Sequence, residues 1–231
     1  MKGSVNLTPR LEAAASYVRQ GGYLADIGTD HAYLPIKLLL EGKISRSLAC
    51  DVVDGPLEKA REHISLYPDI SDRISLLKTD GLKGVEAFDI TDIAVCGMGG
   101  ELISAILGNA PFVRSGGINL VLQPMTRAHE LRVFLAEAGF CTVSESIVSE
   151  GTRVYEIINA VYDGKIRSLT PLEALLGEYN LKAGSEGLYL LAKKQISSLK
   201  NKINGLKRSG RYNGEYDGLL EQLCAVCGEA K

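Results

Sequence analysis

Three segments of this sequence combine acidic residues with glycine in a way that suits nucleoside binding. The first runs from Asp26 to His31, follows a predicted strand and contains Gly28. A glycine in a strand-to-helix turn lets a ligand approach the backbone and the N-terminus of the next helix. Dinucleotide sites use three glycines because a pyrophosphate lies on the turn, but Asp30 and Tyr33 occupy the other two positions here. Because Asp30 would repel a phosphate, the turn favours a ligand with an ammonium group, such as a methionine moiety.

Two further acids follow the second and third predicted strands. Asp51 ends the second strand, 23 positions after Gly28, where doubly wound nucleotide binders place the acid that binds the ribose hydroxyls. S-adenosylmethionine and NAD share this requirement, and an ordinary surface aspartate is the alternative. Asp80 and Gly81 follow the third strand, where a carboxylate can accept a hydrogen bond from an adenine amino group. NAD sites do not generally use this position, so Asp80 favours S-adenosylmethionine as the cofactor.

The fourth predicted strand leads into Gly97-Met98-Gly99-Gly100. Amino-methyltransferases place the loop that positions their substrate here, and its backbone carbonyls hold an amine in line with the methyl group. Glycines would let the backbone approach both ligands; a simple tight turn into a helix is the alternative. After the fifth strand, Gln123-Pro124 faces the same mouth of the sheet and could contact the substrate.

The elements that would position these residues alternate along the chain. A first helix is expected to begin with Thr8 as its cap and Pro9 at its first position. Strands alternating with helices predict a mainly parallel sheet covered on both faces, and the last two strands predict a hairpin. We therefore predict a Rossmann-like, class I methyltransferase fold with a doubly wound, mostly parallel seven-stranded sheet. The predicted strands are 23–27, 47–51, 74–78, 92–96, 119–123, 141–148 and 153–161, and the later helices of this part are 33–41, 56–66, 100–107 and 127–138.

Strand patterns end at about residue 163, which divides the chain into a predicted methyltransferase domain, 1–163, and a helical appendage, 164–231. In the appendage, apolar residues from Ala192 to Leu206 follow one another at intervals of four and three, which is a heptad seam. We expect a coiled-coil-like antiparallel hairpin there, with ordinary docking of one helix on the main domain as the alternative.

Positive charge is concentrated in this appendage. The whole chain has a net charge of −2, but residues 182–211 contain eight Lys or Arg residues and one Glu. A basic helical segment beside an acidic domain suits a nucleic-acid backbone, whereas a solvated helix face is the alternative. The candidate RNA-binding residues are Lys193, Lys194, Lys200, Lys202, Lys207 and Arg208.

Composition limits the other function classes. The 231 residues are 45% hydrophobic and 23% charged, which are globular proportions, and no apolar run is long enough to span a membrane. No signal peptide is recognisable, so we expect a cytoplasmic protein without membrane association. Cys224 and Cys227 form a C-x-x-C pair, but no further cysteine or histidine in the appendage could complete a zinc site. We therefore expect no metal and interpret this pair as part of a packed helix.

Several of these motifs together resemble the bacterial tRNA (adenine 22-N1)-methyltransferase (TrmK) family. They are D-I-G-T-D-H-A-Y-L-P at 26–35, D-G-P at 54–56, D-G-L at 80–82, G-M-G-G at 97–100, L-Q-P at 122–124 and Y-E-I-I at 155–158. The matches span residues 8–162, and the helical appendage is similar in kind. Asp51-Val52 departs from the Glu-Val of many relatives, although an aspartate should still reach the ribose.

The resemblance implies S-adenosylmethionine as the cofactor, tRNA as the partner and N1 of adenine 22 as the methyl acceptor. It also implies that His31 lies beside the transferred methyl group, where it would position a ligand or be an ordinary structural histidine. Arg10 would contact a phosphate near the mouth of the site or be a helix-surface residue, and His63 and His129 receive no role. The expected cofactor-binding residues are Asp26, Gly28, Asp30, His31, Asp51, Asp80, Gly81 and Gly97, and the expected catalytic residues are His31, Gly97, Met98, Gly99 and Gly100.

Other functions stay open at this point. The chain could methylate a small molecule or a protein, or it could be a non-catalytic RNA-binding protein. A nicotinamide-dependent oxidoreductase on a related fold is the third alternative.

Overall fold

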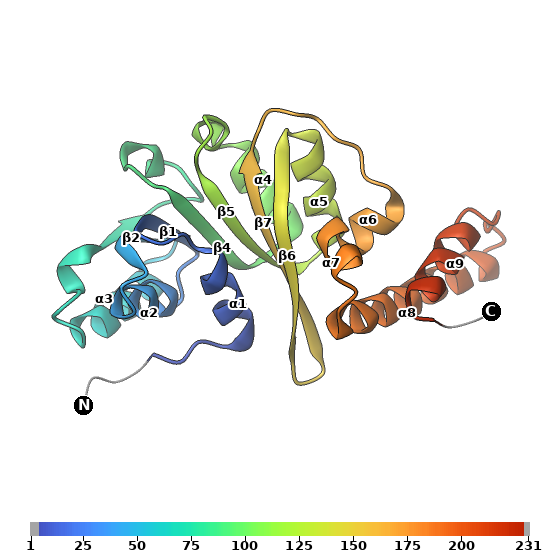
Figure 1. Cartoon of the computed structure of the whole chain (residues 1–231), viewed down its shortest axis with the longest axis horizontal. Coiled ribbons are helices and arrows are strands. Elements are labelled where there is room, and N and C mark those ends of the chain that lie inside the picture. Colours follow the sequence, from blue (N-terminus) through green and yellow to red (C-terminus); the bar gives the residue numbers. More distant parts are fainter. Residues whose placement is uncertain (1–4, 229–231) are drawn as a thin grey trace.

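The computed structural model describes residues 5–228 and contains a seven-stranded sheet (Figure 1). The strands are β1 (Gly22–Ile27), β2 (Ile44–Asp51), β3 (Ile74–Lys78), β4 (Asp92–Gly99), β5 (Asn119–Thr126), β6 (Phe140–Glu150) and β7 (Arg153–Tyr162). Their order is β3-β2-β1-β4-β5-β7-β6, with the first five parallel and β7 antiparallel to both neighbours. This order confirms the predicted doubly wound, mostly parallel fold. Between β1 and β4 the order reverses, which opens a crevice at the carboxyl ends of these strands.

Helices cover both faces of the sheet, and each face has its own apolar core (Figure 1). The helices of this part are α1 (Pro9–Tyr17), α2 (Tyr33–Leu40), α3 (Asp54–Ser65), α4 (Gly100–Gly108) and α5 (Ala128–Glu137). Successive strand residues point to opposite faces, so Leu24 packs in the core of α1, α2 and α3, while Ala25 packs in that of α4 and α5. Burial on both faces explains why the central strands are continuous apolar runs in the sequence.

The first three residues of the G-M-G-G segment form the irregular end of β4, and Gly100 begins α4, so the segment is not the loop after the strand that the sequence suggests. Met98 pairs with Pro124 and Gly99 with Thr126, with register shifts on both sides of Met98. Both strands therefore extend a few residues beyond their predicted ends. The extra pairing holds the glycines against β5, so their backbone is supported on one side and open on the other.

Helix α1 begins at Pro9 as predicted, but Thr8 makes no side-chain cap. The backbone N–H of Arg10 instead donates to Glu150 Oε1 at 2.7 Å. A carboxylate near a helix N-terminus satisfies a free N–H group and interacts well with the helix dipole. This contact attaches the start of α1 to the end of β6, 140 residues further along the chain.

The appendage contains two short helices and a long helical hairpin. Its helices are α6 (Pro171–Leu176), α7 (Glu178–Ala183), α8 (Glu186–Arg208) and α9 (Asp217–Val226). Helix α8 extends away from the sheet, and α9 returns alongside it, so that Cys227 at the end of α9 lies near Tyr189 in the first turn of α8 (Figure 1). The buried face of α8 includes Ala192, Ile196, Leu199 and Ile203 of the predicted seam. Cys224 and Cys227 pack in the same apolar cluster, as their interpretation as helix residues predicts.

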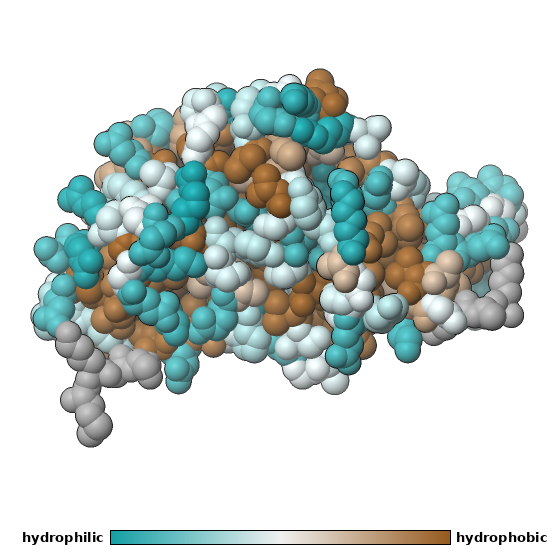
Figure 2. Space-filling model, viewed as in Figure 1, coloured by the Kyte–Doolittle hydropathy of each residue, from teal (hydrophilic) through white to brown (hydrophobic). Residues whose placement is uncertain are grey.

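A buried ion cluster joins the appendage to the sheet. Arg132 of α5 donates to Glu145 Oε1 of β6 at 2.6 Å and to Glu156 Oε2 of β7 at 2.7 Å. Its third nitrogen donates to the backbone oxygen of Ala174 in α6 at 3.1 Å, and the N–H of Tyr179 in α7 donates to Glu145. Apolar side chains also gather where the sheet meets the appendage (Figure 2). The helices α6 and α7 therefore dock firmly on the body from which α8 extends.

Candidate active site

A small pocket lies at the carboxyl ends of β1, β2, β3 and β4, where the strand order predicts a crevice. Its volume is about 100 Å³. That is less than the roughly 300–1,000 Å³ of small-molecule sites, so a nucleoside ligand must extend beyond it over the open edge of the sheet. The lining residues are Ile27, Gly28, Cys50, Asp51, Val52, Thr79, Asp80, Gly81, Met98, Leu102 and Ile106. The structure thus brings together Gly28, Asp51, Asp80, Gly81 and Met98 of the predicted site.

The turn after β1 requires glycine at position 28. Its φ is +75°, and the N–H groups of Gly28 and Thr29 both donate to the backbone oxygen of Cys50 at 2.9 Å. A Cβ at position 28 would lie 2.2 Å from Met98 Cε. The turn is therefore tied to β2 and packed against the G-M-G-G segment, and a side chain would disrupt both its backbone conformation and its packing.

The charge around the pocket is negative. Asp51 Oδ1 accepts the backbone N–H of Val53 at 2.8 Å, which fixes the carboxylate at the end of β2. Asp80 is exposed on the other side of the pocket. Within residues 5–228, no Lys, Arg or His lines this pocket. Such a site suits a ligand that carries hydroxyl donors and positive charge, and it disfavours a diphosphate.

Asp26 lies beneath the turn and is almost fully buried. Burial is the main cause that raises the pKa of its carboxyl to about 6, while the hydrogen bond from Thr29 Oγ1 and the nearby Asp30 and Asp51 act more weakly. Thr29 Oγ1 donates to Asp26 Oδ2 at 2.7 Å. Asp26 therefore supports the turn and holds a negative charge that is costly without a cationic partner.

The next part of this turn is strained. His31 and Ala32 both have positive φ, at 58° and 54°, and the N–H of Tyr33 donates to the oxygen of Asp30 across them. These are the features of a type I′ turn, which glycine and asparagine normally form. A left-handed conformation costs about 1–2 kcal/mol for each ordinary residue. The His31 side chain is about one-third exposed, and its Nε2 lies 3.4 Å from Asp30 Oδ1.

His63, which received no role from the sequence, contacts this turn. Its Nδ1 lies 2.7 Å from the backbone oxygen of His31. Its ring also packs against those of Tyr33 and Tyr67. The contact was not predictable because α3 and the start of α2 are far apart in the sequence and share no spacing pattern.

The G-M-G-G segment packs tightly against β5. Gly97 has a φ of +83°, and a Cβ at position 100 would lie 2.4 Å from the backbone oxygen of Arg127. A Cβ at Gly99 would lie 3.2 Å from Thr126 Oγ1. These glycines therefore allow the end of β4 and the start of α4 to lie close to Thr126 and Arg127.

Gln123 is completely buried, so it supports this segment from beneath and does not face the mouth of the site as expected. Its Oε1 accepts the N–H of Gly97 at 3.1 Å and Nη1 of Arg10 at 2.8 Å. The guanidinium of Arg10 also lies over the ring of Tyr155, 5.6 Å from its centroid. Arg10 thus lies next to Gly97, and its guanidinium contacts Gln123 and Tyr155. Pro124 is buried as well, and its backbone oxygen accepts a hydrogen bond from Nε2 of Gln123.

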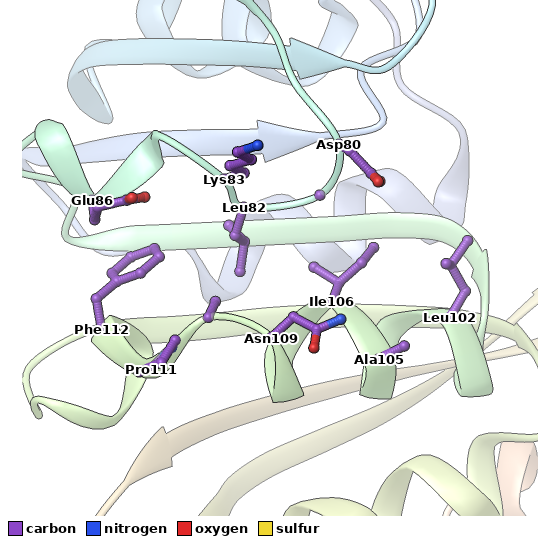
Figure 3. A pocket seen from close by; sticks show the side chains of 12 residues that line it. Asp80, Leu82, Lys83, Glu86, Leu102, Ala105, Ile106, Asn109, Pro111 and Phe112 are labelled. Carbon is purple, nitrogen blue, oxygen red and sulfur yellow. The ribbon is translucent and has the colours of Figure 1, made fainter.

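A larger groove adjoins the pocket and shares Asp80, Gly81, Leu102 and Ile106 with it. Its volume is about 580 Å³. The groove runs between the loop after β3 and helix α4, from Asp80 and Leu102 at one end to Glu86 and Phe112 at the other (Figure 3). The apolar wall of this groove was not predictable, because Leu102 and Ile106 have the spacing of an ordinary helix core.

The cysteines near the site are not nucleophiles. Burial raises the pKa of the Cys50 and Cys96 thiols to about 12, with a smaller contribution from Asp26. Both are therefore protonated at neutral pH. In residues 5–228, no three His, Cys, Asp or Glu side chains are grouped to hold a metal ion, and no helix has the length and apolarity to cross a membrane.

The predicted RNA-binding residues lie on α8, beyond the β6 edge and away from the pocket at the β1–β4 strand ends (Figure 1). All six side chains are exposed. Lys193, Lys200 and Lys207 recur every seven residues, so they share one flank of the helix over about 21 Å. Lys202 and Lys207 lie over the rings of Tyr216 and Tyr212, at 4.3 and 5.1 Å from the centroids. These cations are thus partly ordered by aromatic contacts.

Comparisons with known proteins agree with this geometry. Residues 7–158 match the family described as a methyltransferase domain. The chain is 33% identical to the tRNA (adenine(22)-N(1))-methyltransferase of Bacillus subtilis (strain 168) over 69% of this chain and 70% of that protein. A structure of a candidate tRNA (m1A22) methyltransferase of Streptococcus pneumoniae with S-adenosyl-L-methionine is 29% identical, with a TM-score of 0.82, and covers 96% of this chain and 100% of that one. M. capricolum TrmK with S-adenosyl-homocysteine is 26% identical, with a TM-score of 0.72, over 95% and 94% of the chains.

Proposed function

This chain belongs to the TrmK family of tRNA (adenine(22)-N(1))-methyltransferases, and we propose that it transfers a methyl group from S-adenosylmethionine to N1 of adenine 22 in tRNA. The observation that carries the proposal is the acidic, glycine-lined pocket at the β1–β4 strand ends. A ligand with ribose hydroxyls, an ammonium and a sulfonium complements that charge, whereas the diphosphate of NAD does not.

The residues of the pocket fit the cofactor. Asp51 is fixed through Oδ1, and its Oδ2 has no hydrogen-bond partner among the described residues, so it can accept from a ribose hydroxyl. Asp80 can accept from the adenine amino group, and the apolar side chains of Val52, Leu102 and Ile106 can pack on the ring. Gly28 gives the turn the positive φ that ties it to β2. The acidic Asp26 and Asp30 suit the methionine ammonium.

S-adenosylmethionine supplies an activated methyl group when bound. Since N1 of adenine carries a lone pair, the protein does not need a strong base, and its contribution is positioning and electrostatics. The supported backbone of Gly97 to Gly100 would align the base, with Gln123 and Arg10 beneath it. His31 would lie beside the reacting groups. The adenine must leave any base pair to expose N1, at a cost of about a few kcal/mol.

The appendage, residues 164–231, is proposed to bind the body of the tRNA while residues 1–163 perform the chemistry. The support is the row of exposed cations on α8, since folded RNA is bound largely through its backbone and shape. With tRNA as the substrate, the cytoplasm is the proposed location.

The direct test incubates the protein with labelled S-adenosylmethionine and unmodified tRNA and maps the product. We expect 1-methyladenine at position 22 and no label in a transcript that carries guanine there. Thermal shift should show stabilisation by S-adenosylhomocysteine and none by NAD. Label in another nucleotide, or in protein alone, would overturn the proposed substrate.

The appendage is tested by reversing Lys193, Lys194, Lys200 and Lys202 to Glu. tRNA binding should weaken and its salt dependence should flatten, because fewer counterions are released, while S-adenosylhomocysteine affinity stays the same. Reversing four exposed cations of the main domain, Arg46, Lys59, Arg61 and Arg114, produces the same change in net charge and is the control. An unchanged Michaelis constant for tRNA in the α8 variant would show that this row is not an RNA anchor.

A further inference from the structure

A side-chain hydrogen bond joins α3 to the strained turn at the start of α2. His63 Nδ1 lies 2.7 Å from the backbone oxygen of His31. A carbonyl oxygen can only accept, so His63 donates a proton from Nδ1. The ring is half-buried and lies between Tyr33 and Tyr67, with centroids 4.8 and 5.5 Å away. These contacts fix both the ring and the direction of its donor.

The turn is held at Ala32, whose side chain is fully buried and whose oxygen accepts the N–H of Ile36 at 3.0 Å, and it has less support at His31. His31 and Ala32 are both left-handed, and Ala32 has no polar side chain that could stabilise this backbone locally. The turn's own hydrogen bond, from the N–H of Tyr33 to the oxygen of Asp30, is long at 3.4 Å. The first part of the segment is anchored to β2 through Gly28 and Thr29, but that anchor is two residues before the strained pair. The strained conformation therefore depends on contacts from outside the turn.

We propose that His63 is a positioning residue that holds the His31–Ala32 turn left-handed and so shapes the backbone on which the methionine end of the cofactor lies. The inference rests on the proposed function, because it assigns a consequence for S-adenosylmethionine binding. His63 itself acts through the backbone of His31. Its loss should change the turn before any ligand is added and should then weaken the binding of the cofactor.

Four variants test this role in the full chain. His63→Phe keeps a ring between the two tyrosines and removes the donor. His63→Asn places an amide N–H where Nδ1 lies, and His63→Gln places it nearer to Nε2. Ala32→Gly in the His63→Phe background removes the steric cost of the left-handed conformation at position 32. His129→Phe is the matched control, because His129 lies on α5 and is about half exposed.

Calorimetry with S-adenosylhomocysteine gives the first readout. We expect His63→Phe to bind about tenfold more weakly, as the loss of one well-placed hydrogen bond predicts. His63→Asn and His129→Phe should stay within about threefold of the parent. Ala32→Gly should restore most of the affinity that His63→Phe loses. Parental affinity for His63→Phe, or no recovery from Ala32→Gly, would overturn the proposal.

Hydrogen exchange of the ligand-free protein gives an independent readout. A peptide spanning residues 28–36 should exchange faster in His63→Phe than in the parent, and at the parental rate in His63→Asn. Equal exchange rates in the parent and both variants would overturn the inference, whatever the affinity for S-adenosylhomocysteine. Failure of the parent to bind S-adenosylhomocysteine would instead contradict the proposed function. If His63→Phe does not fold, the comparison of Asn with Gln decides, because equal behaviour of the two would exclude a donor at Nδ1.

Discussion

Two regions of the sheet hold buried charge in opposite ways. One is the β6 edge, named the paired edge, and the other is the carboxyl edge where β1 to β4 end, named the acidic edge. At the β6 edge, Arg132 lies between Glu145 and Glu156, all three are almost fully buried, and every nitrogen of the guanidinium has an acceptor. At the β1–β4 strand ends, Asp26 and Asp51 have no cationic partner among the residues that line the pocket. Buried charges that are paired with one another fix how the elements pack, whereas buried charges without a counter-charge mark a place where a ligand can bind.

Backbone conformation differs between the edges in the same way. The strained pair His31–Ala32 lies at the acidic edge, while the junction at β6 uses a glycine for its positive φ. Gly177 has a φ of +83°, and a Cβ there would lie 2.2 Å from the Glu145 carboxylate. Strain carried by ordinary residues is costly and marks a functional segment more often than a structural joint.

The largest effect is expected at the paired edge. Arg132→Met should destabilise the fold by about 3–5 kcal/mol, because two buried carboxylates lose the cation that pairs with both of them. Unfolding in urea, followed by circular dichroism, measures this change. Arg167→Met is the matched control, since its partner Asp163 is at the surface and such pairs contribute roughly 0–1 kcal/mol.

A triple variant separates charge from packing at this junction. Arg132→Met with Glu145→Gln and Glu156→Gln should regain most of the lost stability, because it leaves no uncompensated charge. If the triple variant is as unstable as Arg132→Met, the shape of the guanidinium and its bond to Ala174 hold the appendage, and the contrast between the two edges loses its basis.

The next effect concerns binding at the acidic edge. Asp51→Ala should weaken S-adenosylhomocysteine binding by about 1.5–3 kcal/mol, since charge-assisted bonds to the ribose hydroxyls are lost. Calorimetry measures this, and stability should change little. Asp89→Ala, an exposed acid at the opposite end of the strands, should bind normally. Equal affinity of Asp51→Ala and the parent would place the ribose elsewhere.

A smaller effect is expected from Asp26 on stability. The pKa of its carboxyl is about 6 in the folded chain against an ordinary value of 3.8. The folded state therefore binds this proton more tightly than the unfolded state does. The resulting contribution to the free energy of unfolding is complete below pH 4 and is lost as the pH rises through 6, by about 3 kcal/mol at most. Asp26→Asn lacks this loss, although its amide N–H₂ adds an unpaired donor.

Asp26→Asn should therefore be more stable than the parent by about 1–2 kcal/mol at pH 8, with the advantage vanishing near pH 4.5. Thermal unfolding at several pH values checks this. An advantage that does not depend on pH would mean that Asp26 is not the source of the unpaired charge.

The sequence contained most of the fold and part of the site. Strand and helix periodicity, together with glycine and acid at successive strand ends, were sufficient for the sheet and for Gly28, Asp51 and Asp80. Contacts between distant segments leave no such pattern. Two polar examples are the hydrogen bond from His63 to the oxygen of His31 and that from the N–H of Gly97 to Gln123 Oε1. The capping of α1 by Glu150 in place of Thr8 is a similar case. The direction of the Gln123 side chain, which places it beneath the G-M-G-G segment, cannot be determined from residue type alone.

The smallest effect is expected at Gln123, a buried side chain with hydrogen-bond partners that supports the acidic edge. Its Oε1 accepts from both Gly97 and Arg10, so Gln123→Leu leaves two donors without an acceptor next to the G-M-G-G segment. We expect kcat for tRNA methylation to fall about tenfold, with S-adenosylhomocysteine affinity within about threefold of the parent. Gln123→Glu keeps both acceptor bonds, adds a charge opposite Arg10 and should retain most of the activity. If Glu is as harmful as Leu, the bond from Nε2 to the oxygen of Pro124 is the important one, and the support of Gly97 from beneath is not what this residue provides.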